Sequence, residues 1–135
     1  MDALMIAPTK ETPAVRFDYA KRRLEMSGES YPENAMAFYA PIRADLDRFL
    51  NSGLAAEGIV VSFAMRYFNS SSTKILRMLV GLLDRAAHGG VPVTLYWLHD
   101  PEDDLMAEFG HDLREEFSGA QITVAATEDL AGFAA

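Results

Sequence analysis

Hydrophobic residues change their spacing near the middle of the chain, and the change predicts a strand followed by a helix. Residues 59–65 form an uncharged apolar run rich in β-branched and aromatic side chains, which is typical of a strand buried on both faces. Further on, apolar residues recur at spacings of three and four, which indicates a helix over residues 73–87. Asn69 and four hydroxyl residues, 70–73, separate the two patterns. The stretch therefore predicts an interior strand, a tight polar turn and a helix packed on one face of the sheet.

The residues before this stretch predict a β-hairpin. Residues 1–12 show no regular pattern and are expected to form a loose lead-in. Apolar side chains then alternate over residues 14–17 and again over residues 23–27, as they do in paired strands joined by a turn. Gly28 is expected to end the second strand.

A first helix is expected between the hairpin and the interior strand. Ser30 followed three residues later by Glu33 has the spacing of a capping box, which predicts the start of the helix. Pro41 lies inside the helical pattern and is expected to kink the helix or to split it in two. The apolar stripe of this helix comprises Met36, Tyr39, Ile42, Leu46, Phe49 and Leu50.

The carboxyl-terminal half continues the alternation of helix and strand. Residues 88–90 predict a helix stop, residues 91–98 a further buried strand, and residues 99–101 a turn. A third helix follows, with acidic residues in its first turn, as the helix dipole favours. Its apolar positions are Leu105, Met106, Phe109, Leu113 and Phe117. A short strand over residues 121–124 and a last helical turn over residues 127–133 complete the chain.

The predicted order of elements is β-β-α-β-α-β-α-β, which is a single α/β domain over residues 13–125 with a tail at 126–135. This alternation favours a mostly parallel sheet covered by helices and connected by right-handed crossovers. Strands that precede helices in such a sheet end at the same edge. The loops at residues 30–34, 69–73 and 99–101 are therefore expected to lie side by side, and a functional site is expected among them.

Composition narrows the classes of partner. The 135 residues carry a net charge of −8 and no basic cluster, so neither nucleic acid nor an anionic membrane is expected as a partner. The absence of cysteine excludes disulfides, thiol catalysis and cysteine-bound zinc. The first residues lack the features of a secretory signal, and no apolar run reaches the roughly 20 residues of a membrane span. We therefore expect a cytoplasmic protein without a cofactor.

The hydroxyl-rich turn at residues 69–73 admits two interpretations. Asn and Ser are among the best N-cap residues, so helix capping accounts for one residue of the turn. A regulatory or binding turn is the alternative, because a phosphate there would meet the free N–H groups and the positive end of the helix dipole. Residue types alone leave both interpretations open.

Several segments resemble the SiaC family of bacterial regulators. They are GESYPEN at residues 28–34, RYFNSSSTK at 66–74 and VTLYW at 93–97, and ETPAV at 11–15 also fits the family's opening. The resemblance implies a fold similar to STAS domains, the anti-sigma-factor antagonists, and a non-catalytic role in partner switching. In such a switch the unmodified protein binds and regulates a target, which in the SiaC pathway is a diguanylate cyclase that controls biofilm formation. A dedicated kinase phosphorylates a hydroxyl in the turn after the central strand, and a phosphatase removes the phosphate.

The resemblance also implies roles for individual residues. The family's phosphoacceptor directly follows the Asn of the turn, which makes Ser70 the expected phosphorylation site and Ser71 the alternative. The family often has Gly in the hairpin turn where this chain has Arg22, which leaves the conformation of that turn open. The loop geometry and the resemblance together predict a partner-binding surface. It consists of Tyr31, Glu33, Asn34, Asn69, Ser70, Ser71, Ser72, His99 and Asp100.

Other chemistry has less support. The alternative function is a small α/β enzyme with its site at the same loops, but these offer hydroxyls and an amide rather than a convergent acid–base set. Glu108 and His111 are three residues apart on the third predicted helix, yet no spacing brings His99 to them. We therefore expect solvent-exposed histidines and no metal site.

Overall fold

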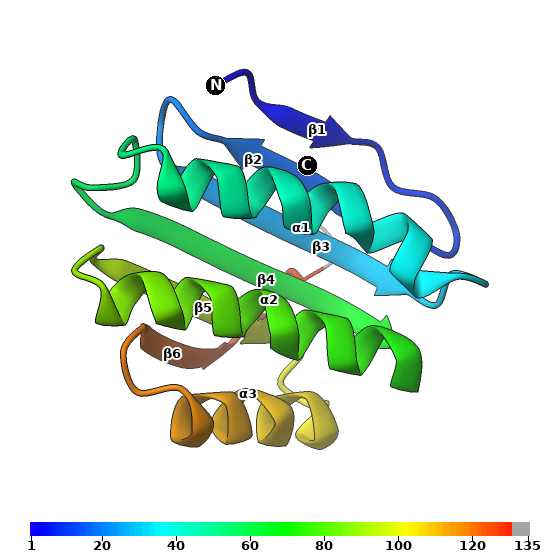
Figure 1. Ribbon diagram of the computed structural model, residues 1–135. Helices are drawn as coiled ribbons and strands as arrows, with labels where there is room; N and C mark the ends of the chain where they lie inside the picture. The colour runs from blue at the N-terminus through cyan, green and yellow to red at the C-terminus, as the bar shows by residue number, and fades with distance from the viewer. Residues whose placement is uncertain (131–135) are drawn as a thin grey trace.

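Within residues 1–130, which the computed structural model describes, six strands form one sheet whose spatial order follows the chain. The strands are β1 Leu4–Ile6, β2 Ala14–Asp18, β3 Arg23–Ser30, β4 Ile59–Phe68, β5 Val93–His99 and β6 Gln121–Ala126. The helices are α1 Ala35–Asn51, α2 Ser70–His88 and α3 Asp104–Glu116. Each helix connects two neighbouring parallel strands, and α1, α2 and α3 lie side by side on one face of the sheet (Figure 1). The predicted α/β fold, with strands and helices alternating after a hairpin, is confirmed.

The amino-terminal segment is not a loose lead-in, because it contributes the edge strand β1. This strand pairs antiparallel with β2, with Leu4 opposite Phe17 and Ile6 opposite Val15. β2 and β3 form the predicted antiparallel hairpin, and β3 to β6 are parallel. A strand of three residues has too few positions to show an alternating pattern, so the sequence predicted one strand fewer than the sheet contains.

The hairpin turn is closed by Arg22 in a left-handed backbone conformation, with φ of 55°. Glycine adopts this conformation without strain, whereas arginine needs support from its surroundings. The Nε of Arg22 donates to the carbonyl oxygen of Gly58 at 3.0 Å, and its guanidinium group lies 3.5 Å from the carboxylate of Glu57. These contacts join the turn to the loop that leads into β4, so arginine forms the turn in place of glycine.

β4 lies in the interior of the sheet between β3 and β5, as predicted, but helices cover only one of its faces. Ile59, Val61 and Phe63 belong to the core, whereas Val60 is 37% exposed on the opposite face. β5 shows the same alternation of buried and more exposed residues. The prediction of a strand buried on both faces is therefore wrong for the first half of β4, although Ala64, on the same face as Val60, is buried. The uncharged run does not distinguish a covered face of the sheet from an exposed one, because a side chain such as Val60 is acceptable on either.

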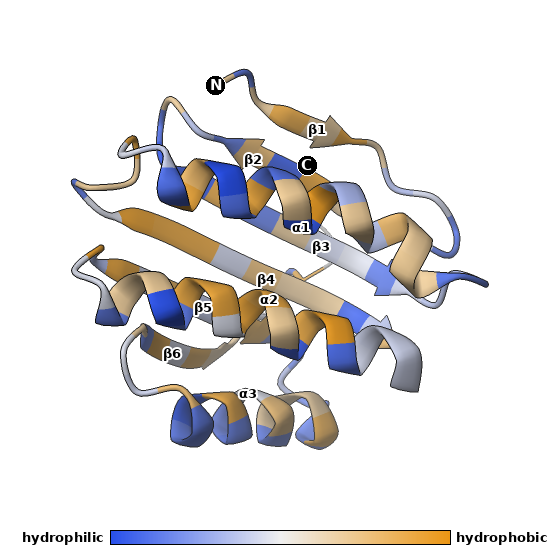
Figure 2. Ribbon diagram, in the orientation of Figure 1, coloured by the Kyte–Doolittle hydropathy of each residue, from blue (hydrophilic) through white to orange (hydrophobic). Residues whose placement is uncertain are grey.

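The main core lies between the sheet and the helices. α2 buries the predicted stripe, including Leu76, Leu79 and Leu83. Figure 2 shows hydrophobic residues along β4 and both hydrophobic and hydrophilic residues on each helix, as in amphipathic helices that pack on a sheet. Met36 and Leu105 are exceptions to the predicted stripes, since they are 77% and 79% exposed. Met36 is the second residue of α1 and Leu105 is the second residue of α3.

α1 begins later than the capping-box spacing predicts. Gly28, with φ of 111°, adjoins a shift in the register between β3 and β4, and β3 continues beyond it to Ser30. Asn34 caps α1, because its side-chain oxygen accepts from the backbone N–H of Ala37 at 3.1 Å. Pro41 lies within one continuous helix, so the predicted split does not occur. Ser30 is therefore a strand residue and not the start of a helix.

Residues 127–130, which follow β6, lie behind the sheet in the view of Figure 1. The backbone N–H of Thr127 donates to the carbonyl oxygen of His99 at 2.8 Å, and Leu130 is buried. Residues 128–130 form a turn, while the rest of the helical turn predicted over 127–133 lies outside the described residues. Among the helices of residues 1–130, none is long and apolar enough to cross a membrane.

Candidate functional site

The loops after β3 and β4 meet at the carboxyl edge of the sheet, as the sequence predicted. The backbone N–H of Asn69 donates to the carbonyl oxygen of Ser30 at 3.0 Å, which joins the turn after β4 to the end of β3. The loop after β5 makes other contacts, since Nδ1 of His99 lies 2.9 Å from the carbonyl oxygen of Asp100. His99 is buried at the end of β5, so the expectation of an exposed histidine is wrong at this position.

Asn69 caps α2. Its side-chain oxygen accepts from the backbone N–H of Ser72 at 3.0 Å, and its carbonyl oxygen accepts from the N–H of Thr73 at 2.9 Å. The hydroxyl of Thr73 donates to the same carbonyl oxygen at 3.0 Å. A single asparagine therefore performs the capping role, and the serine hydroxyls that follow it are not needed for that role.

The serines of the turn differ in exposure. Ser70 and Ser71 are exposed at the start of α2, whereas Ser72 is fully buried. The Oγ of Ser72 lies 2.8 Å from the Oγ of Ser30, which in turn lies 2.6 Å from the hydroxyl oxygen of Tyr39. Ser72 was predicted to belong to the partner-binding surface, but the structure places it inside the protein, because its position on the helix faces β3 and α1.

These contacts form a buried chain of hydroxyl groups, Tyr39–Ser30–Ser72. The chain connects α1, β3 and α2, and all its residues are at most 1% exposed. Burial raises the pKa of Tyr39 to about 12, which extends to alkaline pH the range in which its phenol is protonated and able to donate a hydrogen bond. The chain fixes the first turn of α2 against the second turn of α1.

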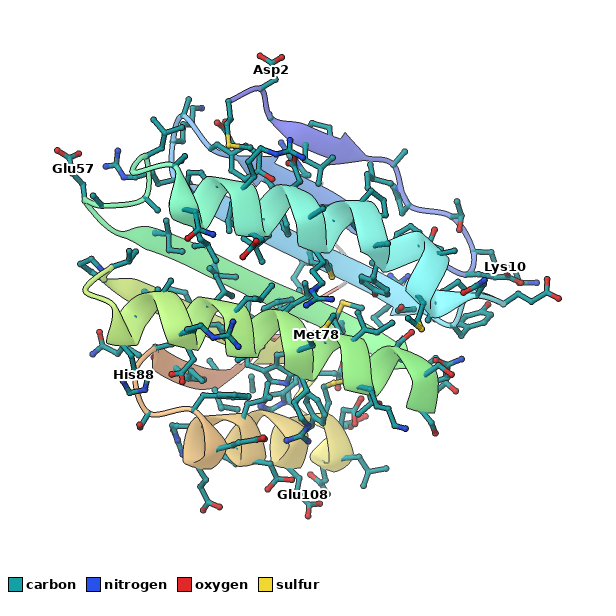
Figure 3. All side chains as sticks on the ribbon, in the orientation of Figure 1. Asp2, Lys10, Glu57, Met78, His88 and Glu108 are labelled. Atoms are coloured by element: carbon teal, nitrogen blue, oxygen red, sulfur yellow. The ribbon has the colours of Figure 1, made fainter. Side chains whose placement is uncertain are left out.

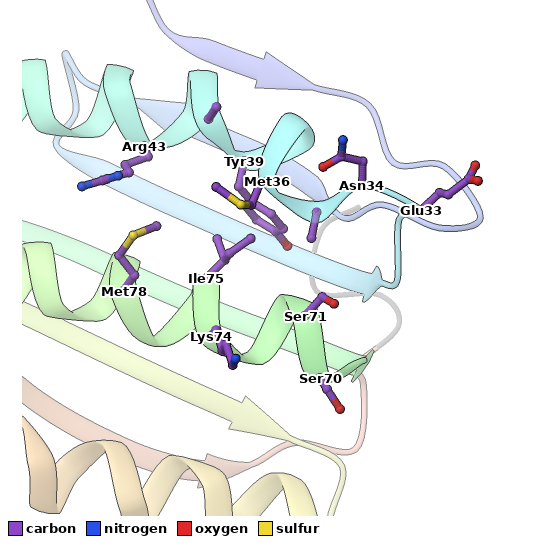
Figure 4. Close-up of a pocket in the computed structure, with 12 residues that line it drawn as sticks. Glu33, Asn34, Met36, Tyr39, Arg43, Ser70, Ser71, Lys74, Ile75 and Met78 are labelled. Atoms are coloured by element: carbon purple, nitrogen blue, oxygen red, sulfur yellow. The ribbon is translucent and has the colours of Figure 1, made fainter.

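A groove of about 560 Å³ runs between α1 and α2 and reaches the serine turn (Figure 4). It is lined by Glu33, Asn34, Ala35, Met36, Tyr39, Ala40, Arg43, Ser70, Ser71, Lys74, Ile75 and Met78. Half of these residues are polar or charged, but most of the surface that lines the groove is apolar. Met36 from α1 and Met78 from α2 lie on opposite sides of it (Figure 4), and Figure 3 shows Met78 among the other side chains of the molecule. The groove thus combines an apolar surface with exposed hydroxyls at one end.

The charged groups of the groove are basic along its length and acidic at one end. Arg43 projects from α1 and Lys74 from α2, while Glu33 lies in the loop before α1 (Figure 4). Within residues 1–130 neither Arg43 nor Lys74 forms a salt bridge. Both cations are therefore free to pair with a ligand. The groove differs in this respect from the chain as a whole, which carries a net charge of −8.

The predicted surface residues fall into two sets. Four of them line the groove at the carboxyl edge of the sheet, where the sequence predicts the site: Glu33, Asn34, Ser70 and Ser71. The others lie outside it: Tyr31, Asn69, Ser72, His99 and Asp100. The ring of Tyr31 instead packs edge-on against Tyr67, with ring centroids 5.9 Å apart.

Sequence reasoning missed the helical walls of the groove, chiefly Met36, Arg43 and Met78. Met36 had been assigned to the buried stripe of α1, although the structure exposes it. No local pattern marks these residues, because the groove exists only where two helices lie side by side. In the described part of the chain, no three His, Asp or Glu side chains are arranged to hold a metal ion.

Comparisons with known proteins agree with this geometry. The model of the SiaC family regulatory phosphoproteins matches residues 6–127. An uncharacterized protein of Pseudomonas aeruginosa is 35% identical over 118 residues, covering 87% of this chain and 92% of that protein. The crystal structure of apo-SiaC from Pseudomonas aeruginosa is 33% identical, with a TM-score of 0.86 over 93% of this chain and 100% of the other.

A second solved structure contains a partner. It is the crystal structure of the diguanylate cyclase SiaD in complex with its activator SiaC from Pseudomonas aeruginosa, and its matched chain is 33% identical with a TM-score of 0.85. The match covers 92% of this chain and 99% of the other. The fold of this chain is therefore that of the SiaC structures, and the STAS-like fold implied by the sequence resemblance is a less close description of it. The chain belongs to the SiaC family of regulatory phosphoproteins.

Proposed function

We propose that this protein is a cytoplasmic, non-catalytic regulator that binds a signalling enzyme when unmodified and releases it when phosphorylated. By likeness to SiaC, which is the activator of SiaD in the matched complex, the partner is a diguanylate cyclase. One observation carries the proposal. The exposed hydroxyls of Ser70 and Ser71 lie at the end of an apolar groove of a size that suits a protein segment. A modification at these serines would therefore act directly on a bound partner.

The groove also suggests what binds in it. A channel between two helices with an apolar interior suits an apolar face of a partner, and the methionines provide flexible contacts that adapt to its shape. Arg43 and Lys74 would pair with acidic side chains beside that face, and Glu33 with a basic one. We therefore propose a partner segment with an apolar face and acidic groups at its margin.

Phosphorylation of Ser70 would oppose this docking. A phosphoserine carries about −1.5 to −2 charges and three strong acceptor oxygens. The first turn of α2 tolerates that charge, because free backbone N–H groups and the helix dipole favour anions there. Lys74, four residues later on the same helix, would then pair with the phosphate instead of the partner. The fold would persist while the groove loses a cation and gains a repulsive charge.

In this proposal, other proteins catalyse the addition and the removal of the phosphate. A serine kinase and a phosphatase would set the modification state, with this protein as their substrate. The groove lining holds a single carboxylate, that of Glu33, and no histidine, and the hydroxyl of Tyr39 is buried in the Tyr39–Ser30–Ser72 chain. The residues of the groove thus offer a docking surface without a convergent acid–base pair, which favours a binding function over the small enzyme considered from the sequence.

Calorimetric binding to the cyclase from the same cell tests the proposal. Wild-type protein, Ser70→Ala and protein phosphorylated by the cell's own kinase are titrated into the cyclase. We expect wild type and Ser70→Ala to bind equally and the phosphorylated form to bind at least tenfold more weakly, a change of about 1.4 kcal/mol. Equal binding by the phosphorylated form would refute the switch. Phosphate on Ser71 would move the site by one residue and leave the mechanism in place.

A further inference from the structure

The turn that opens α2 contains three consecutive serines, yet only Ser70 and Ser71 reach solvent. The third, Ser72, is 0% exposed, and its Oγ contacts the Oγ of Ser30. Ser30 is also 0% exposed and makes a second contact, with the hydroxyl of Tyr39. Ser30 is thus the central member of the buried chain and holds the hydroxyl that lies next to the modifiable pair.

We propose that Ser30 determines which serine is phosphorylated, by keeping the hydroxyl of Ser72 inside the protein and the first turn of α2 closed. A kinase that reaches the turn would then meet Ser70 and Ser71 alone. The inference rests on the proposed function, because it requires that the turn be phosphorylated. It goes further by naming a residue 40 positions before Ser70, on a different element, as a specificity determinant.

The hydrogen bonds around Ser72 support this role. Phosphoryl transfer requires the acceptor oxygen to lie in line with the leaving oxygen of the nucleotide, which a buried hydroxyl cannot achieve. Exposing Ser72 would break its contact with Ser30 and the bond from its backbone N–H to Asn69. The bond between the N–H of Asn69 and the carbonyl oxygen of Ser30 fixes the turn from its other side. Local opening of the helix terminus is therefore unfavourable, and the contact between the two Oγ atoms is the part of this closure that the Ser30 side chain contributes.

The choice of serine matters because a phosphate on Ser70 and a phosphate on Ser72 would have different effects on the protein. At Ser70 a phosphate stays in solvent at the helix terminus, where its charge is tolerated. At Ser72 it would place a dianion in the space occupied by Ser30 and Tyr39, and burial of an unpaired charge opposes folding. Misdirected phosphate would thus damage the protein instead of switching it.

Mutation of Ser30 tests the inference. Removing its hydroxyl leaves those of Ser72 and Tyr39 buried without their shared partner, which favours opened states of the turn. Full-length wild type, Ser30→Ala and Tyr39→Phe are expressed in the native cell, and tandem mass spectrometry locates phosphate in the peptide of residues 67–74. We expect the fraction on Ser72 to rise at least tenfold in Ser30→Ala, equivalent to about 1.4 kcal/mol in the opening equilibrium. Tyr39→Phe should give a smaller rise, since the Ser30–Ser72 contact remains.

Tyr19→Phe is the matched control, because it removes another buried tyrosine hydroxyl that donates to Asp45 on α1 and does not contact the serine turn. Its phosphate distribution should equal that of wild type, which separates a specific effect from general loss of stability. Hydrogen exchange of the same peptide gives a readout independent of the kinase. Exchange should be faster in Ser30→Ala than in wild type and Tyr19→Phe.

The possible results distinguish the two proposals. If wild type carries phosphate on Ser70 or Ser71 and Ser30→Ala shows the same distribution, the role of Ser30 is refuted while the switch stands. A wild type that carries as much phosphate on Ser72 as on Ser70 and Ser71 would likewise refute it. If wild type carries no phosphate in this peptide, the proposed function fails and the role of Ser30 fails with it. Should Ser30→Ala fail to fold, the comparison of Tyr39→Phe with Tyr19→Phe decides.

Discussion

Gly110 of α3 lies directly against the indole ring of Trp97 in β5. A Cβ atom added at Gly110 would overlap Cδ1 of that ring and lie 3.0 Å from its Cγ and 3.1 Å from its Nε1, so the ring or the helix would have to shift. The indole Nε1 donates to the carbonyl oxygen of Met106 at 2.9 Å, which fixes the ring below the helix. Trp97 also packs against Phe63, Phe68 and Phe109, with ring centroids 5.2 to 6.1 Å apart. Glycine at this position therefore sets how closely α3 approaches the sheet.

Replacement of Gly110 by Ala should destabilise the protein by about 1–3 kcal/mol, because the added methyl group would displace a buried ring that is already hydrogen-bonded. Denaturant unfolding measures the loss, and fluorescence of Trp97, the one tryptophan of the chain, reports the changed environment of the ring. Gly81→Ala in α2 is the control. Its Cβ would meet Phe117 at an ordinary 3.6 Å, so helix propensity should make it neutral or stabilising by up to about 1 kcal/mol. Equal effects of the two changes would contradict this packing.

Leu79→Ala should cost about 2–5 kcal/mol of unfolding free energy, since the side chain is fully buried between α2 and the sheet. Leu105→Ala removes the same atoms from an exposed position on α3 and should change stability by less than about 0.5 kcal/mol. Urea unfolding of both variants at neutral pH makes the comparison. A loss at Leu79 as small as that at Leu105 would show that the buried face of α2 is assigned wrongly.

Alkaline stability should depend on Tyr39. Burial raises its pKa in the folded protein to about 12, whereas the unfolded chain titrates near the ordinary value of 10.0. A raised pKa in the folded state means that the stabilisation is complete below about pH 10 and is lost as pH rises toward about 12. Above the unfolded pKa, one such group lowers the unfolding free energy by about 1.4 kcal/mol per pH unit.

Tyr39→Phe does not titrate at this position, so its unfolding free energy should fall less steeply with pH over that window. Part of the decline should remain, because burial and the hydrogen bond to Asp45 also raise the pKa of Tyr19. Urea unfolding at intervals from about pH 9 to pH 12 gives both slopes. Identical slopes for the variant and the wild type would show that Tyr39 ionises as readily in the folded protein as in the unfolded chain.

Lys74→Glu should weaken binding of the proposed cyclase partner at least tenfold, because it reverses a free cation in the wall of the groove. Lys21→Glu makes the same charge change in the exposed hairpin turn and should leave affinity nearly unchanged. Titration calorimetry at low and high salt tests both variants, and the difference between them should shrink as salt screens the charges. Equal affinities at low salt would place the docking surface outside the groove.

The linear sequence determined the main elements and their order. The uncharged run at residues 59–65 predicted an interior strand of the sheet, though not which of its faces is covered, and the spacing of apolar residues in α2 identified the face that packs on it. The serines were located only approximately, because the spacing predicts a helix from residue 73, whereas α2 begins at Ser70 and the serines form its first turn. Part of the resemblance to the SiaC family lies in these residues. These features depend on neighbours along the chain, because the periods of helix and strand decide which side chains share a face.

Tertiary structure decided which hydroxyls are available and what surrounds them. Ser71 and Ser72 are adjacent and identical in type, yet Ser72 is buried because β3 ends beside it with Ser30 and α1 places Tyr39 nearby. The groove likewise requires Met36 and Met78, which come from separate helices. No local pattern encodes such a meeting, since it depends on the order of strands in the sheet and the distance between helices laid across it. The sequence therefore located the turn, and only the packing of α1 against α2 turned its surroundings into a site.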